Sequence, residues 1–198
     1  NEVPAIGEAW YGGTEAGNAI ASVLAGEVNP SGKLPITIPK HAGQIPMYYY
    51  QRPSRYWTGY GLGSSREDEK PAFCFGHGLS YTSYEYSGLK IDSVIPQTQD
   101  IEFTFTVKNT GNMAGKETAL VFIRDCVSSV VTPVACLKGF EKVSLNPGES
   151  KDIRIVIPYS DLGLWNEDMK YVVESGKFNL MIGRSVEDIR IKKDFFIK

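Results

Sequence analysis

Short segments of alternating apolar and polar residues, which continue to the end of the chain, most constrain its fold. Within residues 101–107, Ile, Phe, Phe and Val alternate with Glu, Thr and Thr, which predicts a strand with one buried face. Further strands are predicted at 117–124, 137–145, 152–157, 171–173, 177–182 and 189–197. Turn residues such as Asn146-Pro147-Gly148 separate some of them. About seven short strands predict an immunoglobulin-like sandwich of two sheets over residues 85–198.

Residues 1–40 have a different pattern, which predicts a strand, a helix and a second strand. The strands are expected at 3–10 and 34–38. Between them lies a stripe of apolar residues with helical spacing: Ala16, Ala19, Ile20, Val23 and Leu24. Thr14 is the expected N-cap, Glu15 is placed in the first turn, and Gly26 is expected to end the helix.

A unit of forty residues cannot bury both faces of its own strands. Residues 1–40 are therefore expected to be the last part of an α/β layer whose remainder precedes Asn1. In that case the segment exposes apolar side chains, including Ile6, Trp10, Ile20 and Leu24.

Residues 41–84 are rich in glycine, proline and aromatic residues and show no periodicity, which favours an interdomain strap. The aromatic segment from Tyr48 to Tyr60, together with Arg52 and Arg55, has two interpretations. Its rings and guanidinium groups suit a sugar-binding platform, and they equally suit contacts between domains. The strap interpretation is favoured, and a contribution to the rim of a substrate pocket stays open.

Charge and cysteine content exclude several classes of function. The 21 basic and 23 acidic residues leave a net charge of −2, so neither a nucleic acid nor an anionic membrane is an expected partner. The longest apolar runs, such as 119–123, fall far short of the ~20 residues of a membrane helix. Three cysteines are too few for a disulfide scaffold; a bridge between Cys126 and Cys136 is possible, but two free thiols are favoured.

No metal or cofactor is expected. A calcium site would draw on five aspartates that lack the spacing of a calcium loop and are better explained as solvated strand ends: Asp92, Asp100, Asp125, Asp161 and Asp168. Trp165 is expected in the core or in an interface rather than stacked on a sugar.

Three sequence motifs are more informative about the fold than the periodicity of apolar residues. The first comprises residues 16–21 (AGNAIA) and 26–35 (GEVNPSGKLP), and the second is 75–82 (FGHGLSYT). The third combines 137–143 (LKGFEKV) with 145–150 (LNPGES). In this order they resemble the C-terminal portion of glycoside hydrolase family 3, namely the end of its α/β-sandwich domain followed by its fibronectin type III-like domain.

The resemblance implies that the whole protein is a retaining exo-acting β-glycosidase for terminal β-D-glucosyl or xylosyl residues. Such enzymes use two carboxyl groups about 5–5.5 Å apart. In the family these are an Asp on an N-terminal barrel and commonly a Glu on the α/β sandwich, and both would precede Asn1. No residue here matches either motif, so no catalytic residue is assigned. The chain is expected to be a scaffold for upstream catalytic domains in a secreted or periplasmic protein, and inactive alone.

Two carboxylates and two other functions remain as alternatives. Glu8 lies beside Trp10 and Tyr11, where its pKa could be raised for acid catalysis, and Glu15 follows a Gly-Gly turn. A loop anchor and a helix N-terminal residue, respectively, are the favoured interpretations. A free-standing carbohydrate-binding or adhesion sandwich is the alternative function, against which the α/β segment counts. A small intact hydrolase is disfavoured, since the sequence has no carboxylate pair and no G-x-S-x-G motif.

Overall fold

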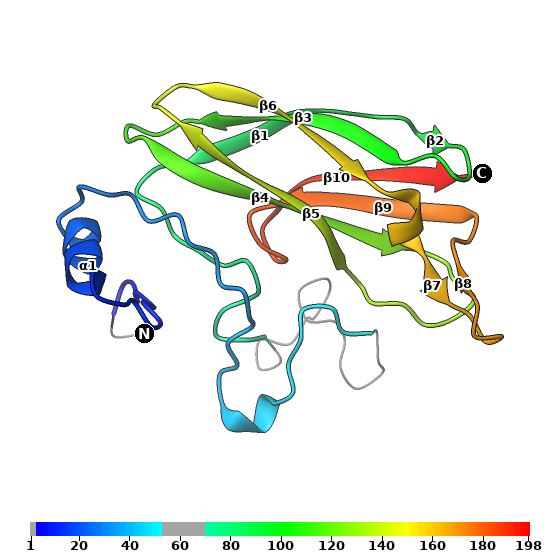
Figure 1. Cartoon of the computed structure of the whole chain (residues 1–198), viewed down its shortest axis with the longest axis horizontal. Helices are drawn as coiled ribbons and strands as arrows, with labels where there is room; N and C mark the ends of the chain where they lie inside the picture. The colour runs from blue at the N-terminus through cyan, green and yellow to red at the C-terminus, as the bar shows by residue number, and fades with distance from the viewer. Residues whose placement is uncertain (1–2, 53–69) are drawn as a thin grey trace.

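The computed structural model describes residues 3–52 and 70–198, and its strands from Tyr84 onward form two facing sheets (Figure 1). The three-stranded sheet has the order β1 (Tyr84–Ile91), β3 (Ile101–Asn109), β6 (Ser150–Ile157). The five-stranded sheet has the order β2 (Val94–Ile95), β10 (Ile189–Ile197), β9 (Gly176–Gly183), β4 (Gly115–Asp125), β5 (Cys136–Leu145). The predicted β-sandwich is confirmed.

The sandwich core follows the alternation seen in the sequence. In β3 the side chains of Ile101, Phe103, Phe105 and Val107 are buried against the facing sheet. The antiparallel register with β6 runs without interruption from Ile101 opposite Ile157 to Lys108 opposite Ser150. Phe178 and Phe195 stack on each other within the same core. Alternation therefore identified the buried face, because successive side chains of a strand point to opposite sides.

Strand β4 is buried on both faces. Val121 and Ile123 point into the sandwich, whereas Leu120 and Phe122 belong to a second apolar cluster on the outer face of the five-stranded sheet. That cluster also includes Met47, from the segment that precedes the sandwich. A second layer of chain over the sheet thus explains why residues 119–123 are all apolar.

A two-stranded hairpin extends from the sandwich. It consists of β7 (Leu164–Trp165) and β8 (Tyr171–Val172), and the 3₁₀ helix η3 (Tyr159–Leu162) precedes it. A strand was expected at 171–173. It is present over 171–172, but it pairs with β7 and belongs to neither large sheet.

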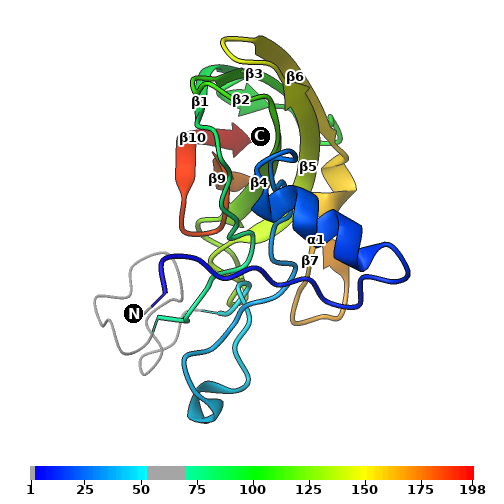
Figure 2. The same cartoon turned by 90° about the vertical axis from the view of Figure 1, so that its left-hand side faces the viewer.

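The N-terminal segment contains α1 (Ala16–Leu24), which confirms the predicted helix; it lies outside the sandwich in Figure 1, on the side that faces the viewer in Figure 2. Gly26 has the left-handed backbone, with φ 76°, that ends helices favourably. The N-cap is Glu15 and not Thr14, and it makes no side-chain capping bond. The expected capping is therefore wrong.

The strands predicted in this segment are mostly wrong. Residues 3–10 form no strand, and of 34–38 only Ile38 makes a bridge, with Phe73. A strand needs a neighbour that pairs with its backbone, and Pro35 has no amide hydrogen to donate. The 3₁₀ helix η1 (Ala42–Gln44) then leads toward the outer face of the five-stranded sheet.

Candidate functional site

Residues 3–40, called the α/β segment although they form one helix and no strand, meet the sandwich at a tight contact between residues 29–34 and 76–82, here called the joint. The amide of Leu34 donates to the carbonyl of His77 at 2.9 Å, and the amide of Gly76 donates to the carbonyl of Leu34 at 2.8 Å. A Cβ atom on Gly78 would lie 2.3 Å from the carbonyl oxygen of Gly32. Glycine at position 78 is thus needed for the two backbones to approach each other.

Asn29 connects the two sides of the joint and contacts the residue that precedes β4. Its Oδ1 accepts hydrogen bonds from the Ser80 hydroxyl and the Tyr81 amide, both at 2.9 Å. Its Nδ2 donates to the carbonyl of Ala114 at 3.1 Å, just before β4. Next to it, a Cβ on Gly115 would lie 2.6 Å from the same Nδ2. One side chain therefore fixes the turn after α1 against both the motif at residues 75–82 and the sandwich.

Glu117, on β4 beside the joint, is a buried carboxylate, with only 1% of the residue exposed. Its Oε1 lies 3.3 Å from Lys33 Nζ and 3.1 Å from Arg184 Nε, and it accepts a hydrogen bond from the Tyr86 hydroxyl at 2.9 Å. We call these four residues the Glu117 cluster. They come from the α/β segment, β1, β4 and the turn between β9 and β10, so the cluster joins four separate parts of the chain.

Burial governs the electrostatics of this cluster. It lowers the pKa of Lys33, against the opposing attraction of Glu117, since a charged ammonium loses its hydration there. Burial, and then the nearby Glu117 carboxylate, raise the pKa of Tyr86 far above its ordinary value of 10.0. The phenol of Tyr86 therefore stays protonated and serves as a donor to Glu117.

Sequence reasoning missed Glu117, although the sequence contained a signal for it. Glu117 lies two, four and six residues before Ala119, Val121 and Ile123, so its side chain points to the same side of the strand, toward the core. A carboxylate on the buried face of a strand requires partners, because an uncompensated charge in the interior is costly. The alternation of side chains along β4 could thus have identified Glu117 as a buried ionic contact.

A second contact lies on the outer face of the five-stranded sheet. The Tyr49 ring stacks on Phe75, with centroids 4.2 Å apart, and meets the edge of Phe122 at 6.0 Å. Met47 is buried beside them, whereas Tyr48 and Tyr50 are exposed. These contacts are of the kind that the strap interpretation predicts. The rest of the aromatic segment, 53–60 with Arg55, lies outside the described residues, and Arg52 is exposed.

The two carboxylates considered for acid catalysis make local bonds. Glu8 Oε1 accepts from the amide of Trp10 at 3.0 Å, and Glu15 Oε2 accepts from Asn18 Nδ2 at 2.6 Å. Both side chains are on the exposed N-terminal segment. Glu15 lies at the N-cap and not in the first turn, where it was expected.

The remaining candidate ligands are dispersed. Across residues 3–52 and 70–198, no three His, Cys, Asp or Glu residues come together as a possible metal site. Asp100 and Asp125 accept hydrogen bonds from the amides of Tyr159 and Val127, at 2.9 and 3.2 Å, and Asp168 faces Lys170 at 4.0 Å. The thiols are free, and burial raises their pKa values: Cys74, Cys126 and Cys136.

The surface of the N-terminal segment is strongly apolar. Helix α1 buries none of its residues, and Leu24 on its apolar stripe is 78% exposed. Ile6, Trp10 and Ile20 are exposed too, which confirms the exposure predicted for them. An amphipathic helix with an uncovered apolar face is typical of a surface that binds a partner.

The comparisons with known proteins match both parts of this arrangement. The Glycosyl hydrolase family 3 C-terminal domain matches residues 1–81, and the Fibronectin type III-like domain matches residues 117–186. The chain belongs to glycoside hydrolase family 3. The Glu117 cluster thus connects the two family domains, since Lys33 lies in the first match and Glu117, with Arg184, in the second.

Relatives within family 3 include a periplasmic β-glucosidase from Salmonella typhimurium, which is 40% identical over 98% of this chain and 26% of its own length. A β-xylosidase from Formosa agariphila is 40% identical over 92% of this chain and 25% of its own length. The crystal structure of a β-glucosidase from Listeria innocua in complex with glucose superposes with a TM-score of 0.86 and 33% identity, over 96% of this chain and 27% of that one. The chain therefore spans about a quarter of these relatives.

Among residues 3–52 and 70–198, no helix is long and apolar enough to cross a membrane.

Proposed function

We propose that this chain works as a scaffold within a larger retaining exo-acting β-glycosidase that removes terminal β-D-glucosyl or xylosyl residues. The relatives named as β-glucosidase and β-xylosidase support this class of substrate. The nucleophile and the acid/base are supplied by catalytic domains upstream, and the chain alone is inactive.

The uncovered apolar face of α1 carries this proposal. Its stripe is exposed, while the segment itself is fixed to the sandwich by Asn29 and the Glu117 cluster. A face that is both apolar and held in place has the properties of a docking surface, because little conformational freedom is lost when a partner covers it. The upstream α/β layer is the partner that we assign to this face.

The held α/β segment also distinguishes the scaffold from a free-standing binding module. An independent sandwich has no use for a helix whose apolar stripe it leaves uncovered. We assign a secreted or periplasmic location to the whole protein, on the basis of the periplasmic relative.

Hydrolysis of aryl β-glucosides and β-xylosides tests the proposal. We expect turnover by the whole protein and none by purified residues 1–198 at high concentration. Turnover by residues 1–198 that Glu8→Gln abolishes would place a catalytic carboxyl in this chain and refute the scaffold role. Absence of turnover by the whole protein on either substrate would refute the proposed activity.

A further inference from the structure

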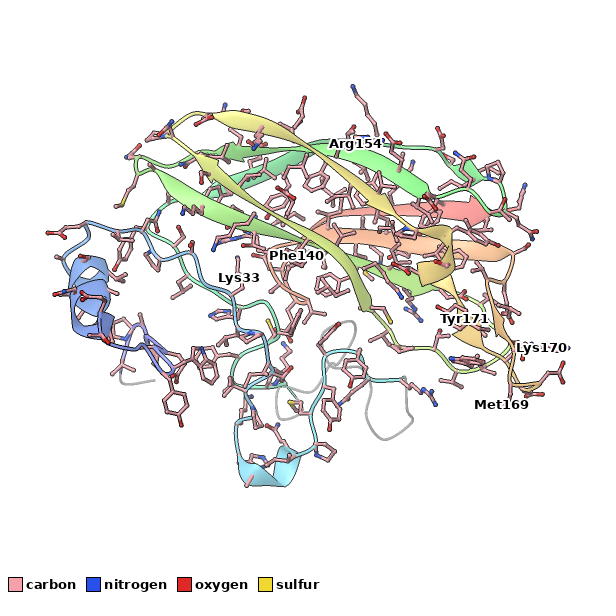
Figure 3. All side chains as sticks on the ribbon, in the orientation of Figure 1. Lys33, Phe140, Arg154, Met169, Lys170 and Tyr171 are labelled. Atoms are coloured by element: carbon pink, nitrogen blue, oxygen red, sulfur yellow. The ribbon has the colours of Figure 1, made fainter. Side chains whose placement is uncertain are left out.

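The β7–β8 hairpin presents two aromatic rings to solvent. Trp165 is 61% exposed and Tyr171 is 49% exposed, and their ring centroids lie 5.5 Å apart with planes inclined by 59°. Trp165 was expected in the core or in an interface. Its exposure shows that it is not a core residue. We call the surface formed by these two rings the hairpin face. It lies at the opposite end of the molecule from α1 (Figures 1 and 3).

Hydrogen bonds hold this face rigid. Across the turn, Asn166 donates its amide to the Lys170 carbonyl at 3.0 Å and accepts the Lys170 amide on Oδ1 at 2.9 Å. The Tyr171 hydroxyl donates to the Ser160 carbonyl at 2.9 Å. Gly163 lies so close to the Tyr171 ring that a Cβ there would be 2.4 Å from a ring carbon. The Tyr171 ring is thus positioned before any ligand binds, and Trp165 lies against it, which lowers the entropic cost of binding.

The area of the hairpin face limits what can bind to it. A fully buried aromatic side chain covers roughly 150–250 Å², and these two are only 61% and 49% exposed, so together they supply well under half of the ~800 Å² per partner in a stable protein interface. The face is of a size to contact a few sugar units. Because sugar rings have apolar C–H faces, they can stack on exposed aromatic rings.

The charges around the hairpin face indicate an uncharged ligand. Glu167 and Asp168 carry negative charge, Lys170 carries positive charge, and all three side chains are exposed. Charges of mixed sign give no strong field for an anionic or cationic partner. They do provide donors and acceptors for hydroxyl groups at the edge of the two rings.

We propose that the hairpin face binds a β-linked oligosaccharide, with a sugar ring stacked on Trp165 and hydroxyl groups near Asp168 and Lys170. The sugar-binding role follows from the rings and their surroundings. The choice of β-linked glucose or xylose units rests on the proposed function. The face lies at the opposite end of the chain from α1, so a partner that covers that helix does not by that contact cover the hairpin (Figures 1 and 3).

Calorimetric titration of residues 1–198 with cellohexaose, laminarihexaose and xylohexaose tests this site. We expect saturable binding of at least one of them, and Trp165→Ala should weaken it about tenfold. Trp165→Phe keeps a ring and should retain most of the affinity. Phe140→Ala is the matched control, because Phe140 is equally exposed on β5, away from the hairpin (Figure 3).

Three results would overturn the proposal. They are no binding of any of the three sugars, equal affinity in wild type and Trp165→Ala, and self-association of the chain that Trp165→Ala abolishes in sedimentation. The last result would assign the face to a second copy of this chain. The titration involves no hydrolysis, so its outcome is separate from the test of catalytic activity.

Discussion

Lys33 Nζ lies 3.3 Å from Glu117 Oε1, across 84 residues of sequence, and this pair crosses from the α/β segment to strand β4. The Lys33 side chain is 12% exposed and that of Glu117 is 2% exposed, so solvent screens the pair little. Arg184 and Tyr86 contact the same carboxylate oxygen. One buried acidic group therefore helps to fix the orientation of the two parts of the chain, beside Asn29 and the backbone hydrogen bonds of the joint.

Replacing Glu117 with glutamine should destabilise the chain strongly. The change removes the carboxylate that Lys33 and Arg184 contact directly, and these side chains are only 12% and 20% exposed; breaking a buried ion pair typically costs about 3–5 kcal/mol. Urea unfolding measures the change in the free energy of unfolding.

Glu102→Gln is the matched control for this variant. Glu102 also pairs with an arginine, Arg154, at 2.6 Å, but both side chains are largely exposed (Figure 3). Its removal should leave the unfolding midpoint nearly unchanged, because exposed ion pairs contribute little. Equal destabilisation by the two variants would contradict the role given to burial.

Tyr86→Phe should reduce stability at neutral pH by about 1.5–3 kcal/mol, since Glu117 loses a hydrogen bond from a buried donor. The loss should become smaller at alkaline pH. The pKa of Tyr86 is raised in the folded state, so above pH 10 the unfolded chain releases the phenol proton while the folded chain keeps it.

The folded state then binds more protons than the unfolded state, and stability falls as the pH rises. Wild type should lose up to about 1.4 kcal/mol per pH unit more than Tyr86→Phe above pH 10. Unfolding of both proteins between pH 8 and 11 measures this difference. Parallel stability profiles would show that Tyr86 ionises equally in the two states.

Gly78→Ala should disturb the joint, because its Cβ would lie 2.3 Å from the Gly32 carbonyl oxygen and the backbone would have to move. We expect a cost of about 1–3 kcal/mol. Hydrogen exchange should also become faster at the amides of Leu34 and Gly76, which pair the two segments.

Gly32→Ala provides the control on the opposite side of the same contact. A Cβ there meets open space, so stability should change by no more than about 0.5 kcal/mol. Comparable exchange rates in the two variants would mean that the backbones are not packed as closely as the structure shows.

Leu24→Lys should behave differently in the isolated chain and in the proposed whole protein. Leu24 is exposed here, so the substitution should change the stability of residues 1–198 by less than about 0.5 kcal/mol. If the upstream layer covers α1, a buried lysine should cost about 2 kcal/mol or more in the whole protein. Asn18→Lys, on the opposite face of the helix, should be tolerated in both, and thermal unfolding compares the two variants in each protein.

Sequence patterns predicted the sandwich and α1 because both depend on local periodicity. Two local patterns show which face of each element is apolar: the alternation at Ile101–Val107 and the helical spacing that ends at Leu24. Residues 3–10 failed as a strand for the opposite reason. Strand formation requires a partner backbone, and the sequence of a segment does not show whether one is present.

The joint was only partly predictable. Asn29, Lys33 and Gly78 lie in two of the motifs that carry the family resemblance, so both sides of this contact stood out in the sequence. Their partners Ala114 and Glu117 lie 85 and 84 residues away, and no local pattern connects positions so distant in sequence. Long-range pairs of this kind are determined by the packing of β4 beside the segment.

The scaffold role is tested most directly by hydrogen exchange at the amides of α1, residues 16–24. In residues 1–198 alone we expect weak protection, because the helix buries none of its residues. In the whole protein the upstream layer should cover Leu24 and its neighbours and slow exchange at least ~100-fold. Equal protection of α1 in both proteins would contradict the account, since its apolar face would then have no partner in the rest of the enzyme.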